Sequence, residues 1–314
     1  MTRLQDVYPD NKIILREVGL RDGLQLVKKF PSTAAKQRWI REEYGAGVRH
    51  FEVGSFLPAT TFPQFVDVRE IIRTVGSLPG AYGIALTLNE RGVNEALASG
   101  VAEVATVVSA TEEHSQANAN RTRDSAIANV KRLCELRDAS EHRPIVNAAI
   151  SMALGCSIVG AVDPLEVLRI TEKLFEAGVD MVAIADTVGY AGPKHVGELT
   201  AGAVKIAGNK PICIHLHDTR GMGIANASAA LDAGARVLDG SLGGLGGCPF
   251  APGATGNVVF EDLAFLCESK GFKTGIDIEK LIAVRAILKS EMPGEALYGG
   301  MARAGLPGGA AKAA

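Results

Sequence analysis

The chain of 314 residues lacks the features that mark several large classes of protein. No apolar run approaches the roughly 18 residues of a membrane-spanning helix. The N-terminus shows neither a secretory signal nor an Arg-rich transit pattern. Lysine and arginine number 33 against 35 acidic residues, so the formal charge of −2 gives no attraction to nucleic acid or to an anionic membrane. The sequence therefore predicts a protein that binds neither.

Cysteine is also scarce. The five cysteines are odd in number and scattered, which argues against a disulfide framework and favours a reducing compartment. We therefore expect a cytoplasmic protein, and we expect it to form a homodimer or a higher homo-oligomer. Hydrophobic residues make up 47% of the chain and charged residues 22%, so the chain is able to bury a large core.

The body of the chain alternates short apolar runs, rich in Val and Ile, with segments of helical spacing. Such runs are typical of parallel strands that are buried on both faces. The predicted strands are residues 13–18, 48–53, 83–88, 102–108, 144–151, 179–185, 211–217 and 236–242. The clearest helices between them are residues 32–46, 122–137, 164–177, 193–207 and 223–233.

Eight strands that alternate with helices predict an α/β fold of the TIM (β/α)8 barrel type, which typically takes about 250 residues. A doubly wound open sheet is the alternative, but no G-x-G-x-x-G motif follows the first strand to support it. Residues 278–289 carry an apolar helical stripe, which predicts a short C-terminal helical extension. We expect one domain over residues 1–300 and a flexible Gly- and Ala-rich tail over residues 301–314.

Acidic residues and histidines gather where several predicted strands end. In a TIM barrel the active site lies at that end of the strands. The residues concerned are Arg21 and Asp22 after strand one, Glu52 in strand two, Asp186 after strand six, and His215 and His217 in strand seven. Because unpaired charge inside a barrel is costly, a shared bound metal is the simplest explanation.

His215 and His217 point to the same face of their strand because they are two residues apart. They could form a hydrogen-bonded pair, but with Asp22 at the same mouth we favour metal ligands. Asn257 follows Gly256 and is either a turn residue or a further ligand through its amide oxygen. Mixed nitrogen and oxygen ligands suit Mg²⁺ or Mn²⁺ better than a structural Zn²⁺.

Two other residues have both a structural and a functional interpretation. Arg21 is either an ion-pair partner of Glu52 or Asp186, or a group that stabilises an oxyanion. Cys248 lies in the segment GGLGGCP (243–249), whose glycines permit a mobile loop. A lone cysteine is usually a small buried hydrophobe. On a glycine loop at the active-site end, we interpret it as a proton donor carried by a lid.

The segment REVGLRDGLQ (16–25) resembles the first-strand signature of the DRE-TIM metallolyases, and within them the 3-hydroxy-3-methylglutaryl-CoA lyase family. Further matching segments follow in order: SMALGC (151–156), ADTVG (185–189), HLHDT (215–219), GGLGGCP (243–249) and GATGN (253–257). The resemblance runs from residue 13 to residue 275. GGLGGCP, with the downstream GN and ED pairs, is specific to the lyase branch of the superfamily.

The resemblance implies a Mg²⁺- or Mn²⁺-dependent retro-Claisen cleavage of an acyl-CoA to acetyl-CoA and a keto acid, which is acetoacetate for 3-hydroxy-3-methylglutaryl-CoA. It implies metal ligation by Asp22, His215, His217 and Asn257. It also implies enolate stabilisation by Arg21, acid–base or orienting roles for Glu52 and Asp186, and a turnover role for Cys248. His215, Glu52 and Asp22 are all candidates for the base. The expected substrate-binding residues are Gln25, Ser55, Asn147, Ala149 and Ser151.

Two departures from the family pattern bear on the substrate. Leu26 and Val27 stand where the lyases usually have Asn and Glu. Asn147 and Ala149 stand where they usually have Arg and Tyr on strand five, which would enlarge and neutralise that wall of the site. We therefore expect modest activity on the methylglutaryl thioester and better activity on one with a bulkier branch or a citramalyl-type carboxylate.

Two rival functions belong to other classes of protein. One is a Claisen-condensing synthase of the same superfamily, and the other is a catalytically silent barrel that serves as a binding scaffold. The cysteine loop argues against the synthase. The intact ligand positions argue against the scaffold.

Overall fold

The computed structural model describes residues 3–247 and 256–307 of the chain. Its strands form a closed parallel barrel in which each strand pairs with the next and β8 pairs with β1. The predicted TIM barrel is therefore confirmed, and the doubly wound sheet is excluded. The strands are β1 (Ile14–Glu17), β2 (His50–Ser55), β3 (Tyr82–Leu86), β4 (Glu103–Ser109), β5 (Ile145–Ser151), β6 (Met181–Asp186), β7 (Ile212–Leu216) and β8 (Val237–Gly240).

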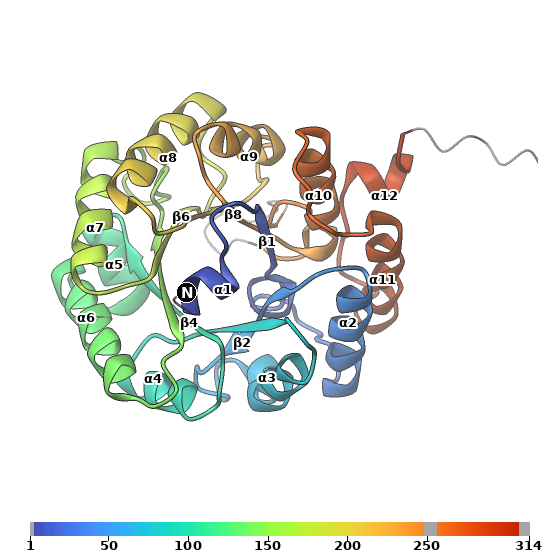
Figure 1. The fold of residues 1–314 in the computed structure, drawn as a ribbon, viewed down its shortest axis with the longest axis horizontal. Helices are drawn as coiled ribbons and strands as arrows, with labels where there is room; N and C mark the ends of the chain where they lie inside the picture. The colour runs from blue at the N-terminus through green and yellow to red at the C-terminus, as the bar shows by residue number, and fades with distance from the viewer. Residues whose placement is uncertain (1–2, 248–255, 308–314) are drawn as a thin grey trace, which may run out of the picture.

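Helices surround the barrel as an outer ring (Figure 1). Several of them begin at a side chain that caps the first turn: the Ser32 hydroxyl accepts a hydrogen bond from the Ala35 amide, and the Asp163 carboxylate accepts one from the Leu165 amide. The ring is formed by α2 (Thr33–Gly45), α3 (Val68–Gly76), α4 (Glu90–Leu97), α5 (Glu112–Ala119), α6 (Arg123–Ala139), α7 (Pro164–Glu176), α8 (Pro193–Ala207), α9 (Gly223–Asp232) and α10 (Phe260–Ser269). Short helical turns are η1 (Gly19–Gly23), η2 (Pro63–Phe65) and η3 (Leu242–Gly244).

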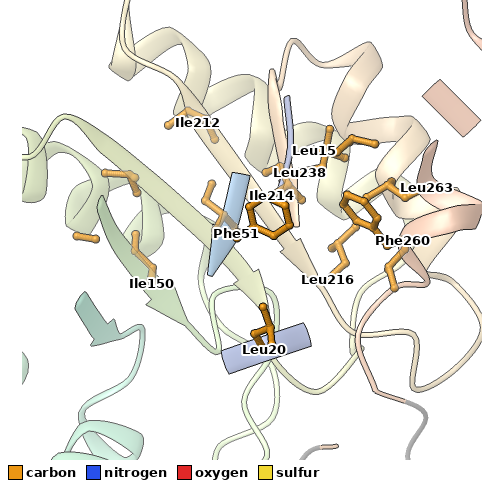
Figure 2. Packing of buried hydrophobic residues seen from close by; sticks show 14 of the residues in the cluster. Leu15, Leu20, Phe51, Ile150, Ile212, Ile214, Leu216, Leu238, Phe260 and Leu263 are labelled. Carbon is orange, nitrogen blue, oxygen red and sulfur yellow. The ribbon is translucent and has the colours of Figure 1, made fainter. Parts of the chain in front are cut away.

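Side chains alternate between the inside of the barrel and the layer beneath the helices, as the period of two requires. On β7, Ile214 and Leu216 belong to the large hydrophobic cluster between strands and helices, whereas His215 lines a cavity inside the barrel. Figure 2 shows part of that cluster, to which β1, β7, β8 and α10 all contribute. The packing of alternate residues into this cluster holds the intervening polar residues toward the barrel axis.

The N-terminal helix α1 (Arg3–Val7) lies in the middle of the ring, over the N-terminal end of the barrel (Figure 1). Val7 and Tyr8 are buried there against a second hydrophobic cluster, which includes Ile145, Met181 and Cys213. This end of the barrel is therefore filled by side chains. The C-terminal ends of the strands are left to form a site.

The predicted C-terminal helical extension is confirmed. It consists of α11 (Ile278–Glu291), which packs beside α2 and α10, and the short α12 (Gly300–Ala304) (Figure 1). The buried stripe of α11 is Ile278, Leu281, Val284, Ile287 and Leu288. Residues 308–314 of the expected flexible tail lie outside the described residues. Over the part of the chain that is described, no helix combines the length and the apolar character needed to cross a membrane.

Candidate metal centre and its pocket

The turn η1 brings Arg21 and Asp22 to the mouth of the barrel directly after β1. The backbone amides of Arg21 and Asp22 both donate to the Val18 carbonyl, which winds the chain tightly at the strand end. Gly19 has no side chain for a steric reason, since a Cβ at that position would collide with the Glu17 carboxylate. The local sequence therefore sets where the two charged side chains emerge.

Asp22, His215 and His217 form a cluster whose potential ligand atoms all lie within 4.8 Å of one another. An Asp22 carboxylate oxygen lies 3.4 Å from Nε2 of His217 and 4.0 Å from Nε2 of His215. Burial acts to raise the pKa of Asp22, but Arg21 and the two histidines hold that pKa well below its ordinary value. Asp22 is therefore an ionised carboxylate that faces two imidazoles.

Asn257 joins this cluster from the segment that follows β8. Its amide nitrogen donates to Asp22 at 2.8 Å, and its Oδ1 is buried with no hydrogen-bond partner among the described residues. The amide nitrogen is the atom that faces Asp22 here, so Asn257 would add an oxygen ligand with its amide group turned over, which would complete a donor set of two nitrogens and two oxygens. That set fits a hard divalent cation such as Mg²⁺ or Mn²⁺.

His215 is oriented by a carboxylate that the sequence analysis did not single out. Nδ1 of His215 lies 3.1 Å from the Asp239 carboxylate on β8. Arg16 on β1 donates two hydrogen bonds to the same carboxylate, from Nε at 2.6 Å and from Nη2 at 3.0 Å. Burial acts to raise the pKa of Asp239, but Arg16 and His215 together bring it below its usual range. A carboxylate on the far nitrogen of an imidazole fixes which nitrogen is free to bind a metal.

Arg21 is held between two acids. Its Nε lies 2.7 Å from Glu52, and its Nη1 lies 2.5 Å from Asp22 and 3.2 Å from the Gln25 side-chain oxygen. Burial raises the pKa of Glu52, although Arg21 acts against that rise. The ion-pair interpretation of Arg21 therefore has a geometric basis, and the same contacts fix the guanidinium at the barrel mouth.

One cavity of about 340 Å³ joins these groups. Among the predicted substrate-binding residues, Gln25, Asn147, Ala149 and Ser151 line it. Apolar side chains such as Leu86 and Val107 form part of its wall. The cavity therefore combines a metal-type cluster, a guanidinium and an apolar surface, a mixture typical of small-molecule sites.

Three predicted site residues that the structure describes are not part of the lining of this cavity: Asp186, Ser55 and Asn257. Asp186 is fully buried, and its carboxylate accepts hydrogen bonds from the amides of Tyr190 and Ala191, so it supports the turn after β6. Ser55 is buried at the end of β2. Cys248 lies outside the described residues, directly after Gly247, which does line the cavity.

Four residues of the cavity region were missed in the sequence: Arg16, Glu103, His114 and Asp239. Arg16 reaches from β1 to Glu103 on β4, with Nη1 and the carboxylate 2.9 Å apart. His114 lines the cavity, and its Nδ1 lies 2.8 Å from the Ser109 hydroxyl. A charged residue inside an otherwise apolar strand, such as Asp239 in β8, is the sequence feature that could have indicated these residues.

The chain matches the model of the HMGL-like family over residues 12–288. It is 37% identical over 276 residues to the hydroxymethylglutaryl-CoA lyase of Pseudomonas mevalonii, which covers 88% of this chain and 91% of that protein. It is 36% identical over 271 residues to a 3-hydroxy-3-isohexenylglutaryl-CoA/hydroxy-methylglutaryl-CoA lyase of Pseudomonas aeruginosa, which covers 86% and 90%. A solved structure of an HMG-CoA lyase from Acinetobacter baumannii, in complex with coenzyme A and 3-methylmalate, is similar with a TM-score of 0.88 at 30% identity, over 96% of this chain and 97% of that one.

Proposed function

This chain belongs to the HMGL-like family, and from that premise we propose that it is a divalent-metal-dependent carbon–carbon lyase acting on 3-hydroxy-3-methylglutaryl-CoA or a close 3-hydroxyacyl-CoA analogue. One observation carries the proposal. The Asp22, His215 and His217 cluster and the Arg21–Glu52 ion pair converge on the same cavity. The relatives named above are lyases of this substrate type, and one was solved with coenzyme A.

Asp22, His215, His217 and Asn257 would hold one cation, which we propose to be Mg²⁺ or Mn²⁺. The support is the donor set, including the buried Oδ1 of Asn257, which has no hydrogen-bond partner within residues 3–247 and 256–307. When bound, the cation supplies Lewis-acid polarisation of the substrate hydroxyl.

The residues of the cavity account for the proton transfers of a retro-Claisen cleavage. A base removes the proton of the tertiary hydroxyl at C3, the C2–C3 bond breaks, and its electron pair stays on the acyl-CoA as an enolate. Glu52 and His215 line the cavity, and each has a pKa above its ordinary value. Burial raises the pKa of Glu52; at His215 burial acts to lower the pKa, but Asp239 and Asp22 together outweigh it. Glu52 can accept that proton, whereas His215 can do so only when its Nε2 does not hold the cation, because its Nδ1 is engaged by Asp239.

Arg21 would balance the charge of the enolate, since its guanidinium is fixed at the mouth by Glu52 and Asp22. Cys248 would return a proton to the enolate carbon, directly or through water. The support for this role is Gly247, which lines the cavity immediately before it. The products are acetyl-CoA and a 3-keto acid, which is acetoacetate for the methylglutaryl thioester.

A metal-dependent cleavage assay tests this function. Purified protein is incubated with 3-hydroxy-3-methylglutaryl-CoA and branched analogues, with Mg²⁺, with Mn²⁺, and after chelation. We expect release of acetyl-CoA that chelation abolishes and added metal restores. Failure to cleave any of these thioesters with either metal would contradict the proposal. Condensation of acetyl-CoA with a 2-keto acid would favour a synthase instead.

The role of Cys248 is tested separately by Cys248→Ser. The variant should keep the melting temperature of the wild type and lose most of its activity, and thiol reagents should inactivate the wild type alone. Full activity in the serine variant would refute the proton-donor role.

We also propose that a C3 branch larger than methyl is cleaved better than methyl itself. Ala149 lines the cavity together with Ala105, Ala183 and Ala185, so three neighbouring strands contribute side chains that leave space. The Pseudomonas aeruginosa relative is named for both a methyl and an isohexenyl branch. A comparison of kcat/KM over a series of branch lengths tests this, and a clear preference for methyl would contradict it.

A cytoplasmic location and a homo-oligomeric state are further proposals. The support for the first is that Cys134, Cys156, Cys213 and Cys267 are buried as free thiols. The support for the second is a stretch of exposed apolar side chains at Ile158, Val159 and Leu165. Light scattering on the purified protein measures the oligomeric state directly, and a monomer at all concentrations would contradict the second.

A further inference from the structure

Asn147 carries a buried polar atom that nothing in the described structure satisfies. Its side chain lines the cavity, the residue is 2% exposed, and Oδ1 has no hydrogen-bond partner. A buried carbonyl oxygen left in this state lowers the stability of the fold. Such an atom is therefore expected to find its partner in something that enters the cavity.

The orientation of the Asn147 amide is set by the charged layer beneath it, which consists of Arg16, Glu103 and Asp239. Glu103 accepts hydrogen bonds from the Tyr8 hydroxyl, from Arg16 at 2.9 Å, and from the Asn147 side chain. Because a carboxylate only accepts, the Asn147 nitrogen faces Glu103. Oδ1 is then the end of the amide that points away from Glu103. It is an acceptor closed to solvent in the ligand-free chain, so a ligand reaches it only by displacing the side chains that cover it.

The charge of this layer excludes an anionic partner. The one guanidinium that reaches it in the described structure, that of Arg16, is already paired with Asp239 and with Glu103. Its positive charge is therefore already balanced and would not attract a substrate carboxylate, and the lone pairs of Oδ1 would repel one. A neutral hydrogen-bond donor is therefore the group that suits this position, and on an acyl-CoA branch that group is a hydroxyl.

The cavity leaves room for a branch to reach Asn147. Ala149 stands two residues further along β5, on the same face and nearer the mouth, and offers only a methyl group. Ala105 on β4 is the register partner of Asn147, and Ala183 on β6 is the register partner of Ala149. Leu86 and Val107 offer apolar surface. The methylene groups of a substrate branch can pack between Ala149 and these apolar side chains, and the polar group at the end of this path is the Asn147 amide.

We propose that Asn147 is a specificity-determining residue that accepts a hydrogen bond from a hydroxyl at the end of the substrate's C3 branch. The preferred substrates are then 3-hydroxyglutaryl-CoA thioesters with a hydroxyalkyl branch at C3. A second carboxylate at this position, as in a citramalyl-type substrate, is disfavoured. This inference rests on the proposed lyase function of the same cavity.

The test compares thioesters that differ only at the branch end. We choose 3-hydroxypropyl against butyl, which have the same number of heavy atoms, with the methyl compound as reference. The wild type should show a kcat/KM for the hydroxylated branch at least about 10-fold above that for its alkyl isostere, because a site built around a hydroxyl discriminates strongly against its loss. In Asn147→Leu, which keeps the size and removes the acceptor, the ratio should fall to one or below.

Each outcome of this comparison is decisive. The ratio is measured on one protein sample, so it does not depend on the fraction that is folded, and the wild-type ratio alone decides the matter if the variant fails to fold. A wild-type ratio of one or less overturns the inference while leaving the lyase function intact, provided that the methyl or butyl compound is cleaved. A high ratio that persists in Asn147→Leu also overturns it. If no thioester is cleaved with either metal, the proposed function fails and this inference fails with it.

Discussion

At its N-terminal end the interior of the barrel is filled with apolar side chains such as Val7 and Met181, whereas at its C-terminal end it holds Asp22, two histidines and a cavity. Between the two ends lies a charged layer in which Arg16 bridges Glu103 and Asp239. The comparison teaches that the same eight strands serve stability at one end of the barrel and the candidate site at the other. Close packing at the closed end stabilises the fold, and the open end carries charged and polar groups arranged around a cavity.

The largest expected effect on activity comes from removing a proposed metal ligand at the open, C-terminal end of the barrel. His217→Ala removes a ligand of the proposed metal, so cleavage should fall by more than the roughly 10- to 100-fold that loss of an outer-shell partner costs. Stability should change little, because the removed ring contacts the cavity. The matched control is His195→Ala on α8, outside the barrel, which should behave as the wild type. Equal losses in the two variants would contradict the division between the ends.

A substitution at the closed, N-terminal end of the barrel should instead lower stability and leave activity unchanged. Met181 is fully buried in the cluster beneath the charged layer. Met181→Ala should lower the free energy of unfolding by about 2–5 kcal/mol through the cavity it creates. Its kcat and its metal affinity should stay at the wild-type level, as measured by denaturant titration and by cleavage assay. A variant that kept its stability and lost activity would overturn the comparison.

The charged layer itself should give a pH signature. Burial raises the pKa of Glu103 from 4.5 to about 7, although Arg16, Tyr8 and Asn147 lower it. Between these values the folded protein holds a proton that the unfolded chain has released, so this group makes stability fall as the pH rises. The loss is about 3 kcal/mol across that window.

Glu103→Gln removes this contribution and leaves the other titrating groups in place. The difference in unfolding free energy between the wild type and the variant should therefore shift by about 3 kcal/mol between about pH 4.5 and about pH 8. Denaturant titrations of both proteins at each pH measure it. A difference that is independent of pH would show that Glu103 has the same pKa in the folded and unfolded chains.

A loss of function smaller than that of His217→Ala is expected at the contact between the charged layer and the open end. Asp239→Asn weakens the hydrogen bond that orients His215, and removal of such a partner typically costs about 10- to 100-fold in metal affinity. The variant also leaves Arg16 with one acid fewer, so its stability should fall. The discriminating readout is the Kd for Mn²⁺. A lower melting temperature with an unchanged Kd would assign Asp239 to the fold alone.

The sequence predicted the open end better than the layer below it, and the reason is geometric. Asp22 follows a strand, and His215 and His217 are two apart, so the ends of the strands and the period of two were enough to bring them together. Arg16 and Glu103 lie on β1 and β4, which do not pair with each other. Their meeting depends on how side chains cross the barrel interior.

The neighbouring polar contacts were hidden for related reasons. Asp239 meets His215 only through the register of β7 against β8, which aligns Ile214 with Leu238. Asp186 was predicted at the correct strand end, but its carboxylate turns back to the amides of Tyr190 and Ala191. Periodicity determines which face a residue occupies. It does not determine the strand offset or the rotamer that selects a partner.

The account depends most directly on a single cation held by Asp22, His215 and His217. Mn²⁺ titration of the chelator-treated protein, followed by electron paramagnetic resonance, measures the number of bound ions per chain and their affinity without any assumption about the substrate. We predict one tightly bound Mn²⁺ per chain in the wild type and a loss of that binding in Asp22→Ala, with the fold retained. A wild-type protein that binds no Mn²⁺ or Mg²⁺, or an Asp22→Ala variant that binds Mn²⁺ as tightly as the wild type, would contradict the account.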